Sequence, residues 1–393
     1  MTNVPRSGGR IPIWRDVRVL AIISQIVVLL VVGLATWLLL GNLFDNMNQK
    51  GLFPSFDFIG QTAGFDIGES LINYEPTDTY GHALFVGLIN TLLVSVLGII
   101  LATLLGLIIG VARLSNNWLV AKLSLGYVEL FRNTPLLLQL FVIYFAVFLQ
   151  LPRVESAIAL PGDIFISNRG LYFPRPIAQE TVQVWSIFLI AAVGLAALAW
   201  WQAGRREAAG KPTLRLRWVS LALLFAVPLI GWFLVGSAPF KNDLPEFGRF
   251  NFSGGASLSP EFAALLLGLA LYTAAFIAEI VRGGIQAVTQ GQREAARSVG
   301  LSESQVLRLI VLPQALRVII PPLTSQYMNL VKNSSLAIAI GYSEIFNVSN
   351  TISNQTGQPL AVILVVMAMY LILSLITSVL MNFYNRRVQI TQR

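Results

Sequence analysis

Long runs of apolar residues, separated by short polar segments, dominate this chain. An apolar run of about 18 residues or more can cross the hydrocarbon core of a membrane as a helix. The pattern therefore predicts an all-α polytopic membrane protein with eight transmembrane helices. The expected spans are residues 19–40, 83–112, 130–150, 184–203, 218–236, 260–281, 314–340 and 359–383.

The first apolar run follows four arginines, Arg6, Arg10, Arg15 and Arg18. Its core of about 20 residues is longer than the apolar core of a signal peptide, and no small-x-small cleavage site follows it. We interpret this run as an uncleaved anchor helix.

The distribution of basic residues indicates the orientation, because Lys and Arg collect on the cytoplasmic side of a membrane. With a cytoplasmic N-terminus, the inner segments contain 20 of the 27 Lys and Arg residues, and the first outer loop contains six acidic residues. Both termini are therefore predicted to be cytoplasmic. The same bias explains the net charge of +8 and gives no reason to expect a nucleic-acid partner.

The spans divide unevenly along the chain. Residues 1–82 are expected to form the anchor helix and an acidic periplasmic loop. A five-helix core is expected in two parts, 83–150 and 260–384. Between these parts, residues 151–259 are expected to form a periplasmic loop and an inserted two-helix hairpin. Residues 385–393 are expected to be a basic cytoplasmic tail.

The residue types exclude several kinds of chemistry. The chain has no Cys and a single His, His82, which excludes thiolate and His-clustered metal sites. An ATP-hydrolysing phosphate loop needs G-x-x-x-x-G-K-[ST]. The pair Gly210-Lys211 begins to match, but Pro212 follows it and Arg205 occupies the first glycine position. No catalytic residue, metal site or cofactor is therefore predicted in this chain.

A polar segment between the sixth and seventh spans, residues 283–313, is predicted to form two short helices on the cytoplasmic side. The first is expected to end at Gly300, because glycine is the usual residue just past a helix C-terminus. Ser302 is expected to cap the second helix, with Gln305 as its capping-box partner. Pro313 is expected to interrupt that helix, since proline lacks the backbone donor.

The first of these two helices has one narrow face of mostly small side chains. Small side chains would let another protein surface approach the helix backbone closely. This face consists of Val288, Gln292, Ala295 and Val299, and the charged residues beside it are Arg293, Glu294 and Arg297. The pattern leaves two interpretations open, an amphipathic helix lying on lipid or a surface that docks a partner. Docking is favoured because the face lacks Trp, Phe and Leu and lies beside Glu294.

Seven positions in this segment follow a known pattern: Glu294, Ala295, Ala296, Gly300, Ile310, Leu312 and Pro313. Their spacing resembles the signature loop of bacterial ABC importer permeases. The resemblance implies that the loop is a coupling helix, which docks on a separate dimeric ATPase that binds the ATP and Mg²⁺. Together with the narrow face and the charges beside it, the resemblance predicts the ATPase-docking residues Val288, Glu294, Ala295, Ala296, Arg297 and Gly300.

The segment YVELFRNTPLLLQLFVIYF, residues 127–145, resembles the polar-amino-acid family of these permeases. Asn133 stands where that family usually has Gly, and Asn333-Ser334 replaces a usual Asp-Thr pair. The anchor helix and the inserted hairpin resemble the long subunit of the general L-amino-acid type, to which glutamate/glutamine/aspartate/asparagine importers also belong. The resemblance implies a multi-pass subunit of the bacterial inner membrane. Its implied partners are membrane lipids, a second homologous permease subunit, an ATPase dimer and a periplasmic amino-acid-binding protein.

Polar residues inside the third and seventh spans are candidates for a substrate pathway, because polar groups in a membrane usually face the bundle or a cavity. Pro321 and Pro322 would break the hydrogen bonds of the seventh span, as in the broken helices of transporter binding sites. The alternative is an ordinary kinked helix that ends at the outer surface. The candidate pathway residues are Gln139, Gln326, Asn329, Asn333 and Ser334.

Other polar residues have simpler expected roles. Asn90, Thr91 and Ser95 are expected to form hydrogen bonds between helices. Glu279 is expected to pair with Arg282 at the inner end of the sixth span.

Three classes of function fit a polytopic fold. They are an ABC importer permease for L-amino acids (polar or acidic ones and their amides), an ion-coupled secondary amino-acid transporter or channel, and a membrane enzyme. A secondary transporter should carry ionisable groups in the middle of its spans, and an enzyme should carry a nucleophile beside a base. Neither pattern is convincing here, so the importer is favoured. Co-purification with an ATPase would discriminate it from a self-sufficient carrier.

Overall fold

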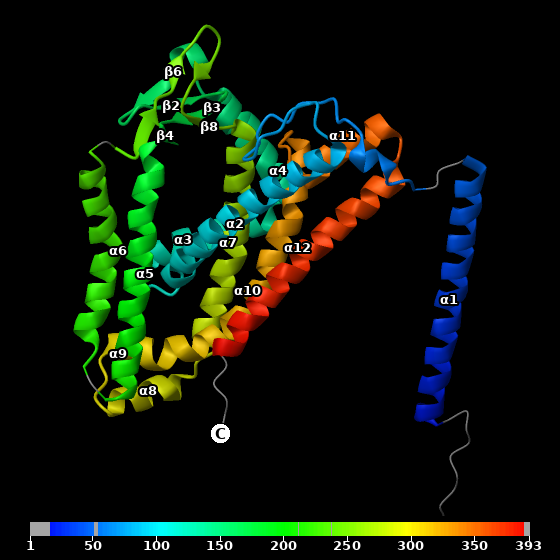
Figure 1. The fold of residues 1–393 in the computed structure, drawn as a ribbon. Helices are drawn as coiled ribbons and strands as arrows, with labels where there is room; N and C mark the ends of the chain where they lie inside the picture. The colour runs from blue at the N-terminus through cyan, green and yellow to red at the C-terminus, as the bar shows by residue number, and fades with distance from the viewer. Residues whose placement is uncertain (1–15, 51–53, 211, 237, 389–393) are drawn as a thin grey trace, which may run out of the picture.

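The computed structural model describes residues 16–50, 54–210, 212–236 and 238–388, and long helices make up most of it (Figure 1). Within these residues, seven helices are long and apolar enough to cross a membrane, and a bent pair of helices is an eighth candidate. The seven are α1 (Val17–Lys50), α2 (Tyr80–Ala112), α5 (Thr181–Ala208), α6 (Leu214–Val235), α7 (Pro260–Gln286), Glu303–Ala339, which contains α10 (Leu312–Asn333), and α12 (Pro359–Val388). The prediction of a mainly helical polytopic membrane protein is confirmed. Three of the four arginines that precede the predicted anchor helix lie outside the described residues, namely Arg6, Arg10 and Arg15. The last five residues of the predicted cytoplasmic tail also lie outside them.

The bent pair is α3 (Trp118–Asn133) followed by the helical stretch Leu136–Gln150, which meets it at 106°. That stretch begins with α4 (Leu136–Phe141) and continues as a π-helical turn, Val142–Val147, and a 3₁₀ turn, Phe148–Gln150. Thr134 is extended because it precedes Pro135, and proline disfavours the helical conformation in the residue before it. The expected single span at 130–150 is therefore wrong at its beginning, since its first residues belong to α3.

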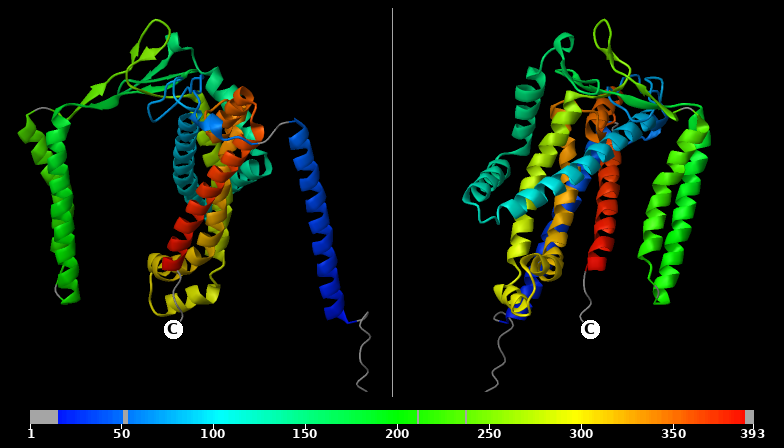
Figure 2. Two further views of the ribbon diagram at one scale, coloured as in Figure 1. Left: turned by 45° about the vertical axis from the view of Figure 1, so that its right-hand side comes forward. Right: turned by 90° about the vertical axis from the view of Figure 1, so that its left-hand side faces the viewer.

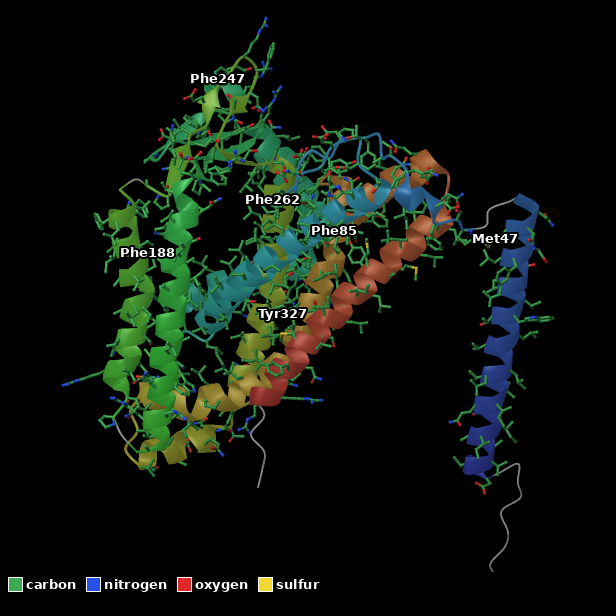
Figure 3. All side chains as sticks on the ribbon, viewed as in Figure 1. Met47, Phe85, Phe188, Phe247, Phe262 and Tyr327 are labelled. Atoms are coloured by element: carbon green, nitrogen blue, oxygen red, sulfur yellow. The ribbon has the colours of Figure 1, made fainter. Side chains whose placement is uncertain are left out.

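The core is built around α2 and α7, which α10, α12 and the short helix α11 (Ile345–Thr356) surround (Figure 1). A Cβ atom added to Gly110 of α2 would lie 2.7 Å from the carbonyl oxygen of Ala278 on α7, so the two backbones are in close contact. Tyr327 of α10 shares a 2.9 Å hydrogen bond with Thr103 of α2 (Figure 3). The fully buried apolar side chains at these contacts include Leu140, Leu265, Leu269, Ile277 and Leu330.

Two parts of the molecule stand apart from this core: α1, as Figure 1 and the left view of Figure 2 show, and the hairpin of α5 and α6, as both views of Figure 2 show. Nearly all the apolar side chains of α1 are exposed, and among its described residues only the buried Met47 and the half-buried Val19 are exceptions. The hairpin of α5 and α6 packs chiefly on itself, with Phe188 against Gly231 (Figure 3) and the buried Ala192 and Ala203 between the helices. Both parts therefore present apolar surfaces to their surroundings, as lipid-exposed helices do.

The described residues between α4 and α7 form eight short β-strands in addition to the expected hairpin, so the prediction of an all-α fold is wrong here. Four of them form an antiparallel sheet in the order β1 (Ile158–Leu160), β2 (Ile164–Ser167), β3 (Gly170–Phe173), β8 (Ala256–Leu258). Two further antiparallel pairs are β4 (Arg175–Ala178) with β5 (Phe240–Asp243), and β6 (Glu246–Phe247) with β7 (Phe252–Ser253).

These strands connect the hairpin to the core. The β4–β5 pair joins the two chain segments that enter and leave α5 and α6, and β8 leads directly into α7. The turn between β1 and β2 contains Gly162 and Asp163, both with positive φ, which is a conformation typical of tight hairpins. We call this end of the molecule the β end, and the opposite end, which carries α8 (Gln290–Ser298), the α8 end (Figure 1).

The remaining short elements lie in the connecting segments. They are the 3₁₀ turns Asp57–Gly60, Val154–Ser156 and Ser334–Ala339, the helix α9 (Glu303–Gln305) and the π-helical turn Val306–Val311.

Candidate functional site

The loop at the α8 end differs from its predicted path in two places. The helix expected to run to Gly300 is broken at residues 287–289, where Thr289 is extended, so α7 ends at Gln286 and α8 is a separate helix. The helix that begins at α9 does not stop at Pro313, because the π-helical turn Val306–Val311 leads directly into α10. The missing donor of Pro313 is tolerated beside this turn, since its wider hydrogen bonds already depart from the α-helical pattern.

The turn at Gly300 is formed as expected. Gly300 has φ +84° and donates its N–H to the carbonyl oxygen of Arg297 (2.9 Å), while Leu301 donates to that of Ala296 (3.2 Å). These are the two hydrogen bonds of a Schellman motif, which requires the left-handed conformation that glycine adopts without strain. The capping box of Ser302 and Gln305 is also present, with Ser302 N donating to Gln305 Oε1 at 2.9 Å.

The residues of the predicted docking loop lie on two sides. Val288 and Ala296 are buried in the same apolar cluster as Val306 and Val311, so they fasten the loop to the core. Glu294, Ala295, Arg297 and Gly300 are exposed, together with Gln292 and Val299. The predicted narrow face is therefore wrong in one respect, because Val288 points inward while Gln292, Ala295 and Val299 point outward. We call Glu294, Ala295, Val299 and Gly300 the docking surface.

The charged side chains of the loop have different roles. Arg293 donates to the carbonyl oxygen of Ile285 (2.8 Å) and thereby caps the C-terminus of α7. Arg297 pairs with Glu303 across the Gly300 turn, with Nε 2.6 Å from Oε1 and a second hydrogen bond of 3.1 Å. Glu294 accepts a hydrogen bond from Gln290 (2.8 Å) and is the exposed acid of the docking surface.

The predicted ion pair of Glu279 and Arg282 is confirmed, and a third residue joins it. Glu279 accepts hydrogen bonds from Arg282 and from Arg113, which lies at the end of α2. The cluster links α2 to α7 near the α8 end, which suits a structural role for Glu279.

Three of the predicted pathway residues lie together. Gln326, Asn329 and Asn333 of α10 are spaced for one helix face, where Asn329 is exposed and the other two are half-buried. Ser325 and Lys332 are exposed beside them. Ser334 is fully buried and donates to the carbonyl oxygen of Val331 (2.7 Å), so it does not belong to this polar face.

Gln139 lies at the bend between α3 and α4, where its side chain is almost completely buried. Its Nε2 donates to the carbonyl oxygens of Phe131 and Thr134, both at 2.9 Å. Its Oε1 has no hydrogen-bond partner among the described residues and lies beside an apolar hollow of about 260 Å³. The bonds of Gln139 satisfy carbonyl groups that the bend leaves free in the last turn of α3.

The predicted hydrogen bond between helices is present for Thr91, which joins α2 to the first residue of α11, whereas Asn90 bonds to two loops at the β end. Asn90 donates to the carbonyl oxygens of Glu69 and Ser343, both at 2.8 Å, and Ile345 N donates to Thr91 Oγ1 at 3.1 Å. Ser95 is buried, and its hydroxyl has no partner among the described residues.

Sequence reasoning missed Glu344, which follows Ser343 in the loop between the last two spans. Glu344 is fully buried, accepts hydrogen bonds from Asn347 N (2.8 Å) and Tyr370 OH (2.7 Å), and caps α11. Burial raises the pKa of Glu344 to about 7. A helix-capping signal was available in the sequence, but the burial of the acid was not.

Comparison with known proteins places these features in a family. Residues 211–390 match the family model of the "Binding-protein-dependent transport system inner membrane component". The "General L-amino acid transport system permease protein AapQ" of Rhizobium johnstonii is 45% identical over 379 residues, which cover 96% of this chain and 94% of that protein. The chain belongs to the permeases of binding-protein-dependent ABC importers.

Two further relatives extend over nearly the whole permease. The "Putative amino-acid ABC transporter permease protein YhdX" of Escherichia coli is 48% identical over 368 residues, 93% of each chain. The "Glutamate/glutamine/aspartate/asparagine transport system permease protein BztB" of Rhodobacter capsulatus is 42% identical over 427 residues, 100% of this chain and 99% of that protein.

Membership in this family establishes several points. The permease is a multi-pass protein of the bacterial inner membrane, and it works with an ATPase and a binding protein. ATP is bound and hydrolysed by the partner ATPase, and the permease itself is not an enzyme and carries no cofactor. Among the described residues, no group of three or more His, Cys, Asp or Glu side chains could hold a metal ion.

Proposed function

We propose that this permease is the long subunit of an importer for L-amino acids, including acidic ones and their amides. The names of AapQ and BztB, together with identities of 45% and 42% along nearly the entire chain, support this substrate class. The division into a core at 83–150 and 260–384, with additions at 1–82 and 151–259, is part of the proposal.

In the proposed orientation the α8 end faces the cytoplasm and the β end faces the periplasm. The count of Lys and Arg supports it, since the segments predicted to be cytoplasmic contain 20 of the 27 basic residues, and α8 lies in one of these segments. The docking surface is then accessible to a cytoplasmic ATPase, and the strands at the β end are accessible to a periplasmic binding protein.

The observation that carries the proposed coupling is the two-sided placement of the docking loop. Glu294, Ala295 and Gly300 are exposed to a partner, while Val288 and Ala296 are embedded in the apolar cluster of the core. A close-packed protein interior transmits displacement instead of absorbing it. A movement imposed on α8 would therefore reach α7 and α10, and alternating access would follow as a shift between two populations of the core.

A second permease subunit is proposed to cover the polar face of α10. Exposed polar side chains such as Ser325, Asn329 and Lys332 are unfavourable against lipid and normally face protein or a water-filled cavity. The paired subunit would enclose this face, and Gln326, Asn329 and Asn333 would line the substrate pathway between the two subunits. Ser334 and Gln139 have the structural contacts described above and are not part of this proposed face.

The coupling is tested in the complete complex of both permeases, ATPase and binding protein, reconstituted in liposomes. The variants are Glu294→Lys and Ala295→Arg, which change exposed helical positions without removing a buried contact. Both are expected to insert and assemble normally and to lose the ATP hydrolysis that loaded binding protein stimulates. Full stimulation and full uptake in the double variant would rule out docking at this surface.

A matched pair of glycines provides the control. Gly300 and Gly210 both have positive φ and no protein atom within 4 Å of an added Cβ, and both lie in turns at the α8 end. The same strain is therefore introduced by Gly300→Arg and Gly210→Arg, and only the first is expected to abolish stimulation. Uptake by the wild-type complex, measured with glutamate, glutamine, aspartate and asparagine against basic and aromatic amino acids, tests the substrate class.

A further inference from the structure

The inserted hairpin ends in a feature that the transport function does not use. At the α8 end of α5 and α6, six residues line a hollow of about 440 Å³: Trp200, Trp201, Gly204, Arg205, Glu207 and Arg217. The hairpin stands apart from the core in both views of Figure 2, and all the residues that line this hollow belong to α5 and α6. Any occupant must come from outside the described residues.

Two arginines are held in fixed positions around the hollow. The guanidinium carbon of Arg205 lies 4.3 Å from the centre of the Trp201 ring, and that of Arg217 lies 5.5 Å from the centre of the Trp200 ring. Arg217 also pairs with Glu207 at 2.6 Å. Arg205 has no carboxylate partner among the described residues, so its five N–H donors remain available to an oxyanion.

The charge of the turn fits an anionic ligand. Residues 205–217 contain five basic residues and one acid, Glu207, whose charge Arg217 already offsets. The planar guanidinium group of arginine presents N–H donors with the geometry of phosphate oxygens. Stacking on an aromatic ring fixes the orientation of this group before the ligand binds.

The surroundings of the hollow indicate a lipid. Trp200, Trp201 and Trp218 are more than half exposed, and the exposed Leu198 and Leu214 lie on the same two helices. Tryptophan at the end of a membrane-spanning helix marks the headgroup level, where an apolar surface for acyl chains meets the polar surface for phosphate. A free phosphate ion would use only the arginines and would gain nothing from the apolar rim.

We propose that this hollow binds the phosphate headgroup of an anionic phospholipid, with Arg205 and Arg217 on the phosphate and Trp200 and Trp201 against the acyl chains. The site lies in the cytoplasmic leaflet, and only this choice of leaflet rests on the orientation in the proposed function. Lipid held there anchors the inner end of a hairpin that the core does not support, while the β4–β5 ladder holds its other end.

The site is tested by the lipid that stays bound to the purified complete complex, identified by native mass spectrometry. The probes are phosphatidylglycerol and phosphatidylcholine in equal amounts, with inorganic phosphate as a competitor. The wild type is expected to retain phosphatidylglycerol. The Arg205→Gln variant is expected to retain it roughly fivefold less, since one basic residue near an anionic surface contributes about that factor.

Two further variants separate a defined site from a diffuse positive charge. Gly204→Leu is expected to reduce retention with no change in charge, because no protein atom lies within 4 Å of an added Cβ and the side chain would extend into the hollow. Arg215→Gln removes the same charge from the same turn but does not line the hollow, so retention is expected to be unchanged.

Three outcomes would overturn the lipid site. They are an equal loss in Arg215→Gln and Arg205→Gln, equal retention of phosphatidylcholine, and displacement of the lipid by inorganic phosphate. The ATP hydrolysis that loaded binding protein stimulates is expected to persist in Gly204→Leu and Arg205→Gln, so failure of this proposal is distinguishable from failure of the proposed coupling.

Discussion

Gly106 of α2 lies directly against Ile277 of α7, so closely that a Cβ atom added to Gly106 would be 2.5 Å from Ile277 Cγ2. One turn further along α2, Gly110 lies in the same way against the backbone of Ala278. Lipid tails give apolar helices no hydrophobic reason to associate, so close packing has to hold them together. These glycines join the part of the core before the inserted segment to the part after it.

Replacing either glycine with leucine is expected to destabilise the permease. The new Cβ would overlap Ile277 or the carbonyl oxygen of Ala278, and no rotamer can relieve an overlap at Cβ. A loss of about 1–3 kcal/mol in the free energy of unfolding is expected. The measurement is the thermal unfolding temperature of the purified permease, followed by tryptophan fluorescence.

The control for this prediction is Gly126→Leu. Gly126 lies on α3 with no protein atom within 4 Å of an added Cβ, so the unfolding temperature is expected to stay near the wild-type value. An equal decrease in Gly126→Leu and Gly110→Leu would show that glycine content, and not contact with α7, is what matters.

Glu344 is expected to make the stability of the β end depend on pH. Its pKa is about 7 in the folded protein, against an ordinary value of 4.5, so the folded state keeps a proton that the unfolded state loses. The free energy of unfolding therefore decreases as pH rises from about 4.5 to about 7. The contribution is at most about 3 kcal/mol. Burial also raises the pKa of Glu69, which adds a dependence of the same sign.

The Glu344→Gln variant is expected to flatten this dependence. A glutamine side chain can accept the same hydrogen bond from Asn347 and bond with Tyr370, but it carries no charge to bury. Unfolding temperatures would be compared from about pH 5 to about pH 8. Glu75→Gln, an exposed carboxyl at the same end, should leave the slope unchanged. Superimposable slopes for the wild type and Glu344→Gln would contradict the assignment.

The parts of the structure that were predictable depend on short-range chemistry. A segment can cross a membrane only if its backbone N–H and C=O groups form hydrogen bonds within the protein, as they do in a helix. Long apolar runs in the sequence therefore mark the positions of the membrane-spanning helices. The stop at Gly300, the capping box of Ser302 and the pair of Glu279 with Arg282 involve residues within a few positions of one another.

The features that were missed depend on contacts between distant residues. The break before Thr289 has no Gly or Pro to signal it, and it follows from the burial of Val288 and Ala296 against the core. The hydrogen bond of Asn90 to Ser343 joins residues 253 positions apart. The β-strands are two to four residues long, too short for their alternation to stand out in the sequence.

Gln139 offers the sharpest test between a structural role and a pathway role. Its Nε2 holds the carbonyl oxygens of Phe131 and Thr134 at the 106° bend, and free carbonyl groups are costly at membrane depth. The Gln139→Glu variant keeps the size of the side chain and removes both N–H donors, leaving at most the single O–H donor of a protonated carboxyl. Its free energy of unfolding is expected to fall by about 1–3 kcal/mol, the cost of leaving buried acceptors unpaired.

The matched control is Gln150→Glu, since Gln150 is exposed and its Nε2 makes a single 3.2 Å bond to the carbonyl oxygen of Phe145. Its unfolding temperature is expected to stay close to that of the wild type. If Gln139 lined the substrate pathway instead, Gln139→Glu would change the relative uptake of acidic amino acids and their amides while the unfolding temperature stayed the same. That result would contradict the structural role, because a side chain that holds the bend cannot lose both N–H donors without leaving a carbonyl group unpaired and weakening the α3–α4 junction.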